Sequence, residues 1–367
     1  LLISLTALSG SILNTYDKFA VPAFTPVLLN ISMILSSVYL SQHLDEPIMA
    51  LAWGVLIGGL LQLAFQIPFL IKIRKLPKLV RGDHKAVKKL KKRMLPALFG
   101  VSVSQINLLI DTMIASVLVS GSVSWLYYSD RLLELPLALI GIALATVALA
   151  KLSKHYANKD TKQFTRTIDY ALKIGLILAL PACAGLILLA EPLIITLFQY
   201  DKFSVFAAHQ SSLSLIAYGS GLVAFIMVKI LAPVFLARGD TRTPVKAGVI
   251  AMLSNVVLNG ILGYYFDHVG LAIATSISAL LNGSLLYYYL KKQSIFTFSQ
   301  DLIKMLFKVL MASFIMVLFI LNFDQTQSVY VNADALSRVI MLVTTVCLSA
   351  FIYFLSLRVL GVRMKKL

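Results

Sequence analysis

Two acids and an arginine lie within a stretch that otherwise has the composition of a membrane-spanning helix: Asp130, Arg131 and Glu134, followed by Pro136. A charged side chain at the centre of a bilayer costs roughly 2.5–3.5 kcal/mol on insertion scales. Such a group persists where it faces a partner or a water-filled cavity, so by default it marks a pathway for something polar. Arg131 and Glu134 share one helix face, because residues three apart are neighbours on a helix.

The chemistry that this pattern favours is anion binding by Arg131. The guanidinium group is planar, remains charged, and binds phosphate or pyrophosphate oxygens in a bidentate manner. Glu134 or Asp130 would hold and orient the arginine. The alternative is a purely structural ion pair within the membrane. Aromatic residues nearby are either cavity walls or side chains at the outer membrane interface, and we favour the interface for Trp125.

A second set of polar residues is spread over three predicted helices: Asp111, Asn255, Asn259 and Thr275. At a rise of 1.5 Å per residue, all four lie in the outer half of the membrane, within about 8 Å of one level. Carboxylate, amide and hydroxyl oxygens are the hard ligands that small hard cations prefer. If these helices pack together, the residues form a Na⁺ or H⁺ site. The alternative is ordinary hydrogen bonding between helices.

Apart from such a coupling ion, we expect neither a cofactor nor a metal. Cys183 and Cys347 lie in apolar stretches, with the spacing of neither a disulfide framework nor a metal site. Lys229 lies near the inner end of a predicted helix, where it either snorkels towards the headgroups or lines an inner vestibule. All five histidines fall in predicted loops, so no histidine proton relay is indicated.

The composition is that of an all-α, polytopic integral membrane protein. Of the 367 residues, 59% are hydrophobic and only 13% are charged, and the mean hydropathy is +0.87. Soluble domains are about 25% charged. The net charge of +17 would suggest nucleic acid as the partner of a soluble protein, but here it reflects membrane orientation. We therefore expect membrane lipids, and no nucleic acid, as partners.

The chain contains eleven apolar stretches that we predict to span the membrane, since a span needs about 20 such residues. They are residues 1–14, 22–42, 48–71, 96–119, 123–150, 168–190, 211–237, 245–265, 269–290, 303–322 and 336–357. Residues 191–208 are too charged to span and are predicted to be a surface segment.

The loop charges give a consistent orientation for these spans. Residues 72–93 hold eleven Lys or Arg residues, and alternation from this loop places 28 of the 33 basic residues on one side. Lys and Arg concentrate on the cytoplasmic side of membrane proteins. The pattern thus predicts a multi-pass protein with a cytoplasmic C-terminus.

An internal repeat predicts two lobes. Residues 20–27 and 238–245 each contain Thr-Pro before an apolar run, and the helices that follow also match, with an offset near 220 residues. The predicted partition is residues 1–71 as the second half of a first lobe, 72–95 as a basic cytoplasmic loop, 96–292 as a six-helix lobe, and 293–367 as two accessory helices and a basic tail. Completing two six-helix lobes requires a parent of 14 helices, with three more at the N-terminus.

These motifs resemble the MurJ (MviN) family. The resemblance covers essentially the whole chain, and it is most specific in residues 98–116, around Asp111, and in residues 121–136, with the Asp-Arg-x-x-Glu-x-Pro pattern. Shorter matches lie at residues 197–200, 229–233 and 243–246. Asp201 departs from the family, which usually has glycine there, and Ala150-Lys151 replaces its usual proline-containing end of a helix.

The resemblance implies a transporter from the superfamily of multidrug, oligosaccharide-lipid and polysaccharide exporters, with fourteen helices in two lobes. Its members flip lipid II, the undecaprenyl-pyrophosphate-linked peptidoglycan precursor, across the bacterial inner membrane. By that resemblance Arg131 would contact the lipid II diphosphate, and Glu134 and Ser124 would line a central cavity. Cell-wall synthesis proteins are further partners that it implies.

The sequence therefore predicts a lipid II flippase that works by alternating access, and not an enzyme. The nearest alternative is a cation-coupled exporter of drugs or of another lipid-linked oligosaccharide. A membrane glycosyltransferase or polymerase would need clustered carboxylates or a metal motif in a loop at the bilayer surface. A non-transporting scaffold would need no charged face within the membrane, so Arg131 and Asp111 argue against it.

Overall fold

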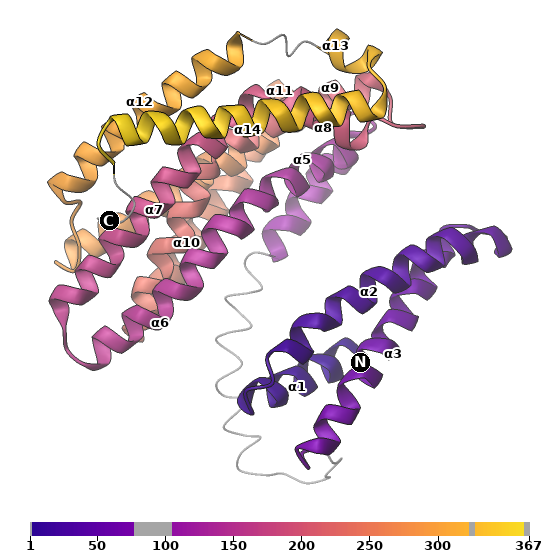
Figure 1. Cartoon of the computed structure of the whole chain (residues 1–367), viewed down its shortest axis with the longest axis horizontal. Coiled ribbons are helices and arrows are strands. Elements are labelled where there is room, and N and C mark those ends of the chain that lie inside the picture. Colours follow the sequence, from indigo (N-terminus) through magenta and orange to yellow (C-terminus); the bar gives the residue numbers. More distant parts are fainter. Residues whose placement is uncertain (1, 77–104, 323–326, 363–367) are drawn as a thin grey trace. The chain divides into compact units, whose positions relative to one another are not determined.

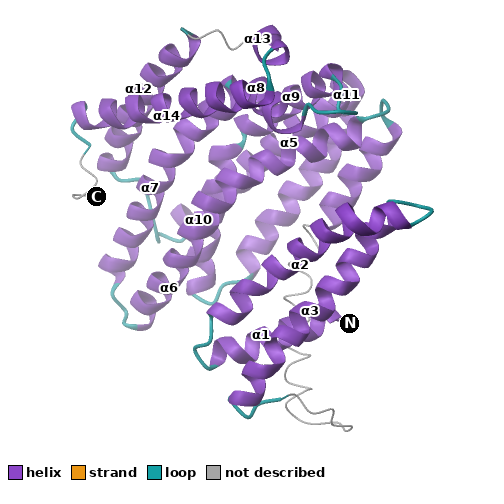
Figure 2. Cartoon of the chain, turned by 45° about the vertical axis from the view of Figure 1, so that its right-hand side comes forward, coloured by secondary structure: helices purple, strands orange, loops and turns teal. Residues whose placement is uncertain are grey.

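Helices are the regular secondary structure of the residues that the computed structural model describes, 2–76, 105–322 and 327–362, and no strand occurs in these ranges (Figures 1 and 2). Seven of the helices in these ranges are long and apolar enough to cross a membrane, or eight if one bent pair counts as a single span. The all-α membrane class is confirmed, while the count of eleven spans stays a prediction. Most of the basic loop 72–95, and residues 96–104 of the fourth predicted span, lie outside the described residues.

The chain divides into two compact units, residues 1–90 and 91–367, and the two are described separately. The first contains α1 (Leu2–Thr15), α2 (Ala20–Tyr39), a short 3-10 turn at Leu40–His43, and α3 (Met49–Lys72). The α2–α3 pair is bound by side chains that reach backbone carbonyls on the neighbouring helix. Ser32 donates to the Gly54 carbonyl over 2.8 Å, and Gln62 donates to the Thr25 carbonyl over 3.0 Å. Small residues at this interface let the two backbones approach closely.

The second unit is a larger bundle. A helix at Gln105–Val117 is followed by α5 (Ser122–Pro136), a π-helical segment at Leu137–Ile142, α6 (Ala143–Ala157), α7 (Thr161–Leu188), α8 (Ala190–Phe198), α9 (Val205–Ser220), α10 (Leu222–Ala237), α11 (Arg242–Lys292), α12 (Gln300–Leu321), α13 (Gln327–Asn332) and α14 (Ala335–Val359). The π-helical segment follows Pro136, whose missing N–H interrupts regular helical hydrogen bonding.

Two breaks divide the longest helical stretches of this unit. The α9–α10 pair bends by 43° next to Gly221, where a Cβ atom would lie 2.6 Å from the Ser276 hydroxyl oxygen of α11. Only glycine permits this close approach. Within α11, Asp267 has non-helical backbone angles (φ 49°, ψ −135°), which separate the predicted spans 245–265 and 269–290.

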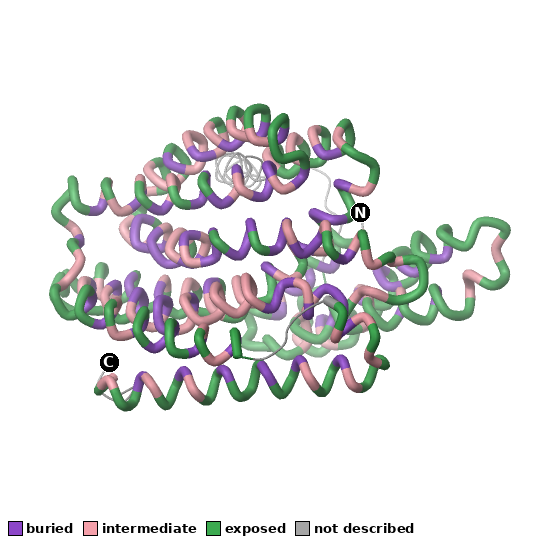
Figure 3. The backbone as a smooth tube through the Cα atoms, turned by 90° about the horizontal axis from the view of Figure 1, so that it is seen from above, coloured by how far each residue is buried: buried purple, intermediate pink, exposed green. Residues whose placement is uncertain are grey.

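The core of the second unit forms where α7 and α10 pack with α6, α9 and α11. Buried residues recur as stripes along the helices, with exposed residues opposite them (Figure 3). α12 and α14 pack on each other and on α7, and the Tyr353 hydroxyl donates to the Ile177 carbonyl over 2.5 Å. The predicted surface segment 191–208 is wrong in part, because α8 buries Ile194 and Ile195 completely.

Candidate functional site

Arg131 lies on an exposed stripe of α5 and is held from two sides. Its Nη1 donates to Glu134 Oε2 over 2.6 Å, and its guanidinium carbon lies 4.8 Å from the centre of the Tyr127 ring. The Arg131 and Glu134 side chains are 53% and 52% exposed. Of the two carboxylates predicted to orient the arginine, Glu134 is therefore the one that contacts it. An arginine stacked on an aromatic face and held by one carboxylate keeps other N–H donors for a ligand.

Asp130 does not join this ion pair in the structure. It lines a cavity of about 290 Å³ together with Asp111, Asn107, Tyr218 and Thr275. We call this the acidic cavity. The sequence grouped Asp130 with Arg131 because they are adjacent in the chain. Successive residues on a helix point about 100° apart, so one of them faces the cavity and the other the exposed stripe.

Ser124 is exposed and lies two helical turns before Arg131, but it lines a different pocket. This pocket, of about 520 Å³, also includes Tyr128, Tyr200 and Asp201. Asp201 has a left-handed backbone (φ 48°), a conformation that favours glycine.

The position of Trp125 also differs from the one that the sequence predicted. It is only 6% exposed, and its ring packs 4.8 Å from the His268 ring and 5.7 Å from the Phe206 ring. The predicted interfacial position is therefore wrong: Trp125 fixes the start of α5 against α9 and the break in α11. Tyr128 likewise packs on aromatic residues beside α8, whereas Tyr127 supports Arg131.

The predicted cation-binding residues come together from three helices. Asn259 Nδ2 donates to Asp111 Oδ1 over 2.5 Å and to Asn255 Oδ1 over 3.0 Å. Asn255 and Thr275 are joined through the Thr275 hydroxyl at 3.3 Å, and that hydroxyl donates to the Leu271 carbonyl over 2.9 Å. Asn255 and Asn259 are 1% and 0% exposed. We call these four residues and Asn107 the Asp111 cluster.

The Asn255 amide fits this cluster in two orientations. In the second orientation its nitrogen donates to Asp111 Oδ1 and Asn107 Oδ1, each over 3.0 Å, and its oxygen accepts from the Thr275 backbone N–H over 3.2 Å. Either orientation keeps Asn255 as the link between Asp111 and Thr275, because an amide offers both donors and acceptors.

One residue of the cluster was missed at the sequence level. Asn107 Nδ2 donates to Asp111 Oδ2 over 3.0 Å, so amides occupy both carboxylate oxygens. The i, i+4 spacing of Asn107 and Asp111 places them on one helix face and was a signal that could have revealed this contact.

The donor set of the Asp111 cluster suits a small cation. The cluster offers one carboxylate, three amides and a hydroxyl, and Asn259 Oδ1 is buried without a hydrogen-bond partner. An unpaired buried oxygen is unfavourable unless a cation, proton or water satisfies it. Among the described residues, no group of three His, Cys, Asp or Glu side chains has the arrangement of a metal site.

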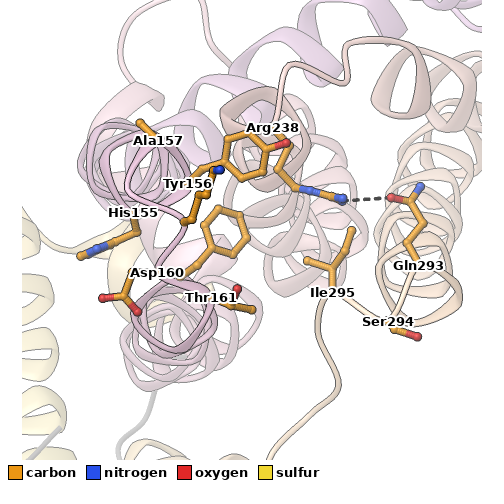
Figure 4. Close-up of a pocket in the computed structure, with 11 residues that line it drawn as sticks. His155, Tyr156, Ala157, Asp160, Thr161, Arg238, Gln293, Ser294 and Ile295 are labelled. Carbon is orange, nitrogen blue, oxygen red and sulfur yellow. Dashed lines mark hydrogen bonds between the residues drawn. The ribbon is translucent and has the colours of Figure 1, made fainter.

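A further pocket lies beside the ends of α6 and α11 and was not predicted. Its volume is about 590 Å³, and it is lined by His155, Tyr156, Arg238 and Gln293 among others (Figure 4). Arg238 Nη1 donates to Gln293 Oε1 over 3.0 Å, which ties the turn after α10 to the end of α11.

Comparison with known proteins identifies the family. A model of the family described as "Lipid II flippase MurJ" matches residues 1–341. The chain belongs to the lipid II flippase MurJ family. This is a family of transporters and not of enzymes, and the resemblance seen in the sequence is thereby confirmed.

Individual relatives agree with this assignment. The probable lipid II flippase MurJ of Vibrio cholerae is 45% identical over 366 residues, which cover 100% of this chain and 70% of the relative. The lipid II flippase MurJ of Burkholderia cenocepacia is 38% identical, with 98% of this chain and 71% of the relative covered.

Solved structures give the same result for the fold. The inward closed conformation of lipid II flippase MurJ has a TM-score of 0.80 at 30% identity, covering 97% of this chain and 70% of that chain. An inward-facing multidrug resistance transporter of the MATE family has a TM-score of 0.68 at 16% identity, covering 80% of this chain and 68% of that chain. The second likeness concerns the fold alone.

Proposed function

We propose that this chain translocates lipid II from the cytoplasmic to the periplasmic leaflet of the bacterial inner membrane by alternating access. The observation that carries the proposal is the exposed Arg131–Glu134 pair on a spanning helix of a chain from this family. The proposal includes two lobes that rock about a central cavity, and a cytoplasmic C-terminus, as the loop charges predict.

Arg131 is proposed to bind the diphosphate of lipid II. Glu134 engages one guanidinium nitrogen, and Tyr127 supports one face of the group, so its remaining N–H donors are preorganised for an anion. A planar guanidinium matches two phosphate oxygens at once. Glu134 then has two functions: it orients the arginine, and it disfavours permanent occupancy by anions. Ser124, further out on the same stripe, is proposed to contact the sugar portion of the headgroup.

The Asp111 cluster is proposed to bind the coupling ion, Na⁺ or H⁺. Without an ion, the amides of Asn107 and Asn259 donate to the Asp111 carboxylate. Rotation of the Asn259 amide would replace this donor by its unpaired oxygen and complete a set of oxygen ligands for Na⁺. Protonation of Asp111 would instead turn the carboxyl group into a donor. Asp130 adds a second carboxyl group to the same cavity.

The test for the substrate is reconstitution of the chain in liposomes that contain fluorescent lipid II. We expect the chain to translocate fluorescent lipid II, so that a reagent outside the vesicle no longer reaches the probe. We expect no translocation of a drug-like cation under the same gradients. Drug transport without lipid II translocation would favour the cation-coupled exporter instead.

The ion is identified by measuring ²²Na⁺ binding to the purified chain over a range of pH. Saturable binding that competes with protons identifies Na⁺ as a ligand of Asp111. Proton uptake without ²²Na⁺ binding identifies H⁺. If neither is observed, the cation part of the proposal fails, while the lipid II assay remains independent of it.

A further inference from the structure

A second polar cavity lies next to the Asp111 cluster, towards the side of the basic loops. Its volume is about 330 Å³, and it is lined by Asn255, Thr275, Ser278, Asn282 and Lys229, together with apolar residues. We call it the inner pocket. It shares Asn107 and Thr275 with the acidic cavity, so the two spaces meet at the Asp111 cluster.

Two residues that line the inner pocket have buried side-chain oxygens without hydrogen-bond partners. Ser278 Oγ and Asn282 Oδ1 have no hydrogen-bond partner, as is also true of Asn259 Oδ1 in the cluster. Thr275, Ser278 and Asn282 lie on one face of α11, because their spacing is i, i+3, i+7. From Thr275 to Asn282 this row of oxygens extends about 10 Å along the helix. Acceptors of this kind are satisfied by water or by a passing cation.

Lys229 is positioned at this pocket by the local backbone. It lies eight residues before the end of α10, or about 12 Å from it. Gly141, in the π-helical segment, makes room for the lysine stem: a Cβ atom there would lie 3.3 Å from Lys229 Cγ. Among the residues that the structure describes, Lys229 forms no ion pair. No carboxylate of these residues therefore lies within ion-pair distance of its ammonium group.

We propose that the inner pocket is a hydrated route through which the coupling cation exchanges between the Asp111 cluster and the side of the basic loops, with Lys229 as its electrostatic gate. This inference rests on the proposed cation site and extends it. A unit positive charge about 10 Å away, at an effective dielectric constant of about 20, lowers the local concentration of a monovalent cation roughly tenfold. Lys229 thus slows escape of the ion to this side, without itself being a ligand.

The test is the chemical accessibility of single cysteines in membrane vesicles with the basic-loop side outwards. Cys183 and Cys347 are first replaced by serine, and cysteine is then introduced as Ser278→Cys, Asn282→Cys or Leu280→Cys. Leu280 is the matched control, since it lies between the other two positions on α11 and is 54% exposed on another face. Two membrane-impermeant methanethiosulfonates of similar size, one anionic and one cationic, modify the thiols.

We expect both pocket cysteines to react and the Leu280 cysteine to remain unmodified in lipid. Relative to a free thiol in solution, the anionic reagent should be favoured roughly tenfold, and Lys229→Gln should abolish this preference while Lys229→Arg keeps it. The proposed route would be overturned if the pocket cysteines do not react in variants whose unfolding temperature equals that of the parent protein. A preference unchanged by Lys229→Gln would overturn the gate.

The same variants separate this inference from the cation site. With Na⁺ as the ion, Lys229→Gln should speed ²²Na⁺ release about tenfold, whereas Asp111→Asn should lower the affinity for Na⁺ at least tenfold. Modified pocket cysteines in a chain that binds neither Na⁺ nor H⁺ would refute the cation site and the ion route together, leaving only a water-filled pocket.

Discussion

The Asp111 cluster and the Arg131–Glu134 pair lie in the same unit, but they differ in how they are completed. Asn255 and Asn259 of the cluster are buried, its other residues are half-buried, and amides from two helices occupy both oxygens of the Asp111 carboxylate. The ion pair lies within one helix, and more than half of each of its side chains is exposed. A partly buried cluster with matched donors is suited to one small ion, whereas an exposed cation on a rigid stripe is suited to a large anionic headgroup.

This difference suggests a division of labour. The cluster can change its charge and hydrogen bonding by binding an ion, because its neighbours already contact one another. Arg131 keeps its charge at any physiological pH and changes only in what it contacts. Variants of the two regions should therefore affect separate measurements, and the predictions below test that separation.

The largest effect is expected for Arg131→Ala. Loss of the guanidinium group should reduce lipid II translocation at least a hundredfold, since a charged hydrogen-bonding partner of the diphosphate is lost. Arg131→Lys should recover only part of the activity, because an ammonium group lacks the planar fork. The translocation assay in liposomes measures both. Cation binding should be unchanged in these variants, and a loss of ²²Na⁺ or proton binding in Arg131→Ala would contradict the separation.

The converse experiment is Asp111→Asn. An amide of similar size removes the carboxylate charge, and we expect cation affinity to fall at least tenfold in a direct binding measurement. Binding of a lipid II diphosphate analogue should be retained, because Arg131 is unaffected. Asp130→Asn is the informative companion: if it weakens cation binding and not lipid binding, Asp130 belongs functionally with Asp111, where the structure places its side chain.

Asn259→Ala tests whether the cluster also stabilises the fold. The variant loses two buried hydrogen bonds, and buried polar pairs between membrane helices contribute about 0.6 kcal/mol each on average. We expect the free energy of unfolding in detergent or bicelles to fall by about 1 kcal/mol. Glu134→Ala, on the exposed pair, should change it by much less. Equal losses of unfolding free energy in Asn259→Ala and Glu134→Ala would show that burial does not distinguish the two regions.

The smallest effect concerns Asp240, outside the membrane spans, at the start of α11. It accepts from the backbone N–H groups of Arg242 and Thr243 and from the Thr243 hydroxyl over 2.6–3.0 Å. Partial burial raises the pKa of Asp240, but these hydrogen bonds together bring it below its usual value. Ionised Asp240 therefore stabilises the folded state above about pH 4, and this contribution is lost as the pH falls through the lowered pKa.

Asp240→Ala should accordingly reduce the free energy of unfolding by about 1 kcal/mol at pH 7, as for other helix caps, and by less near pH 3. Thermal unfolding at the two pH values provides the measurement, with Asp160→Ala, which removes the cap of α7, as a matched comparison. A loss that is equally large at both pH values would show that the ionised carboxylate is not responsible.

Several features of the site could be predicted because they depend on local spacing. Arg131 and Glu134 are three residues apart on one helix, and their contact follows from helix geometry. Depth along each helix placed Asp111, Asn255, Asn259 and Thr275 near one level, although it could not show that the helices touch. Asp130 and Trp125 were misplaced, because the direction in which each faces depends on α9 and α11, which are distant in sequence.

By itself, the sequence determined that this protein is a helical membrane protein and where most of its helices lie, because apolar length and loop charge act locally. It also identified the few polar residues that are unfavourable in a bilayer unless they face a partner or a water-filled cavity. Only the tertiary structure decided which of them share a cavity. That choice depends on packing between helices, on the close approach at Gly221 and on the break at Asp267. Contacts between distant segments are set by the shapes of all the packed side chains together, and no local pattern encodes them.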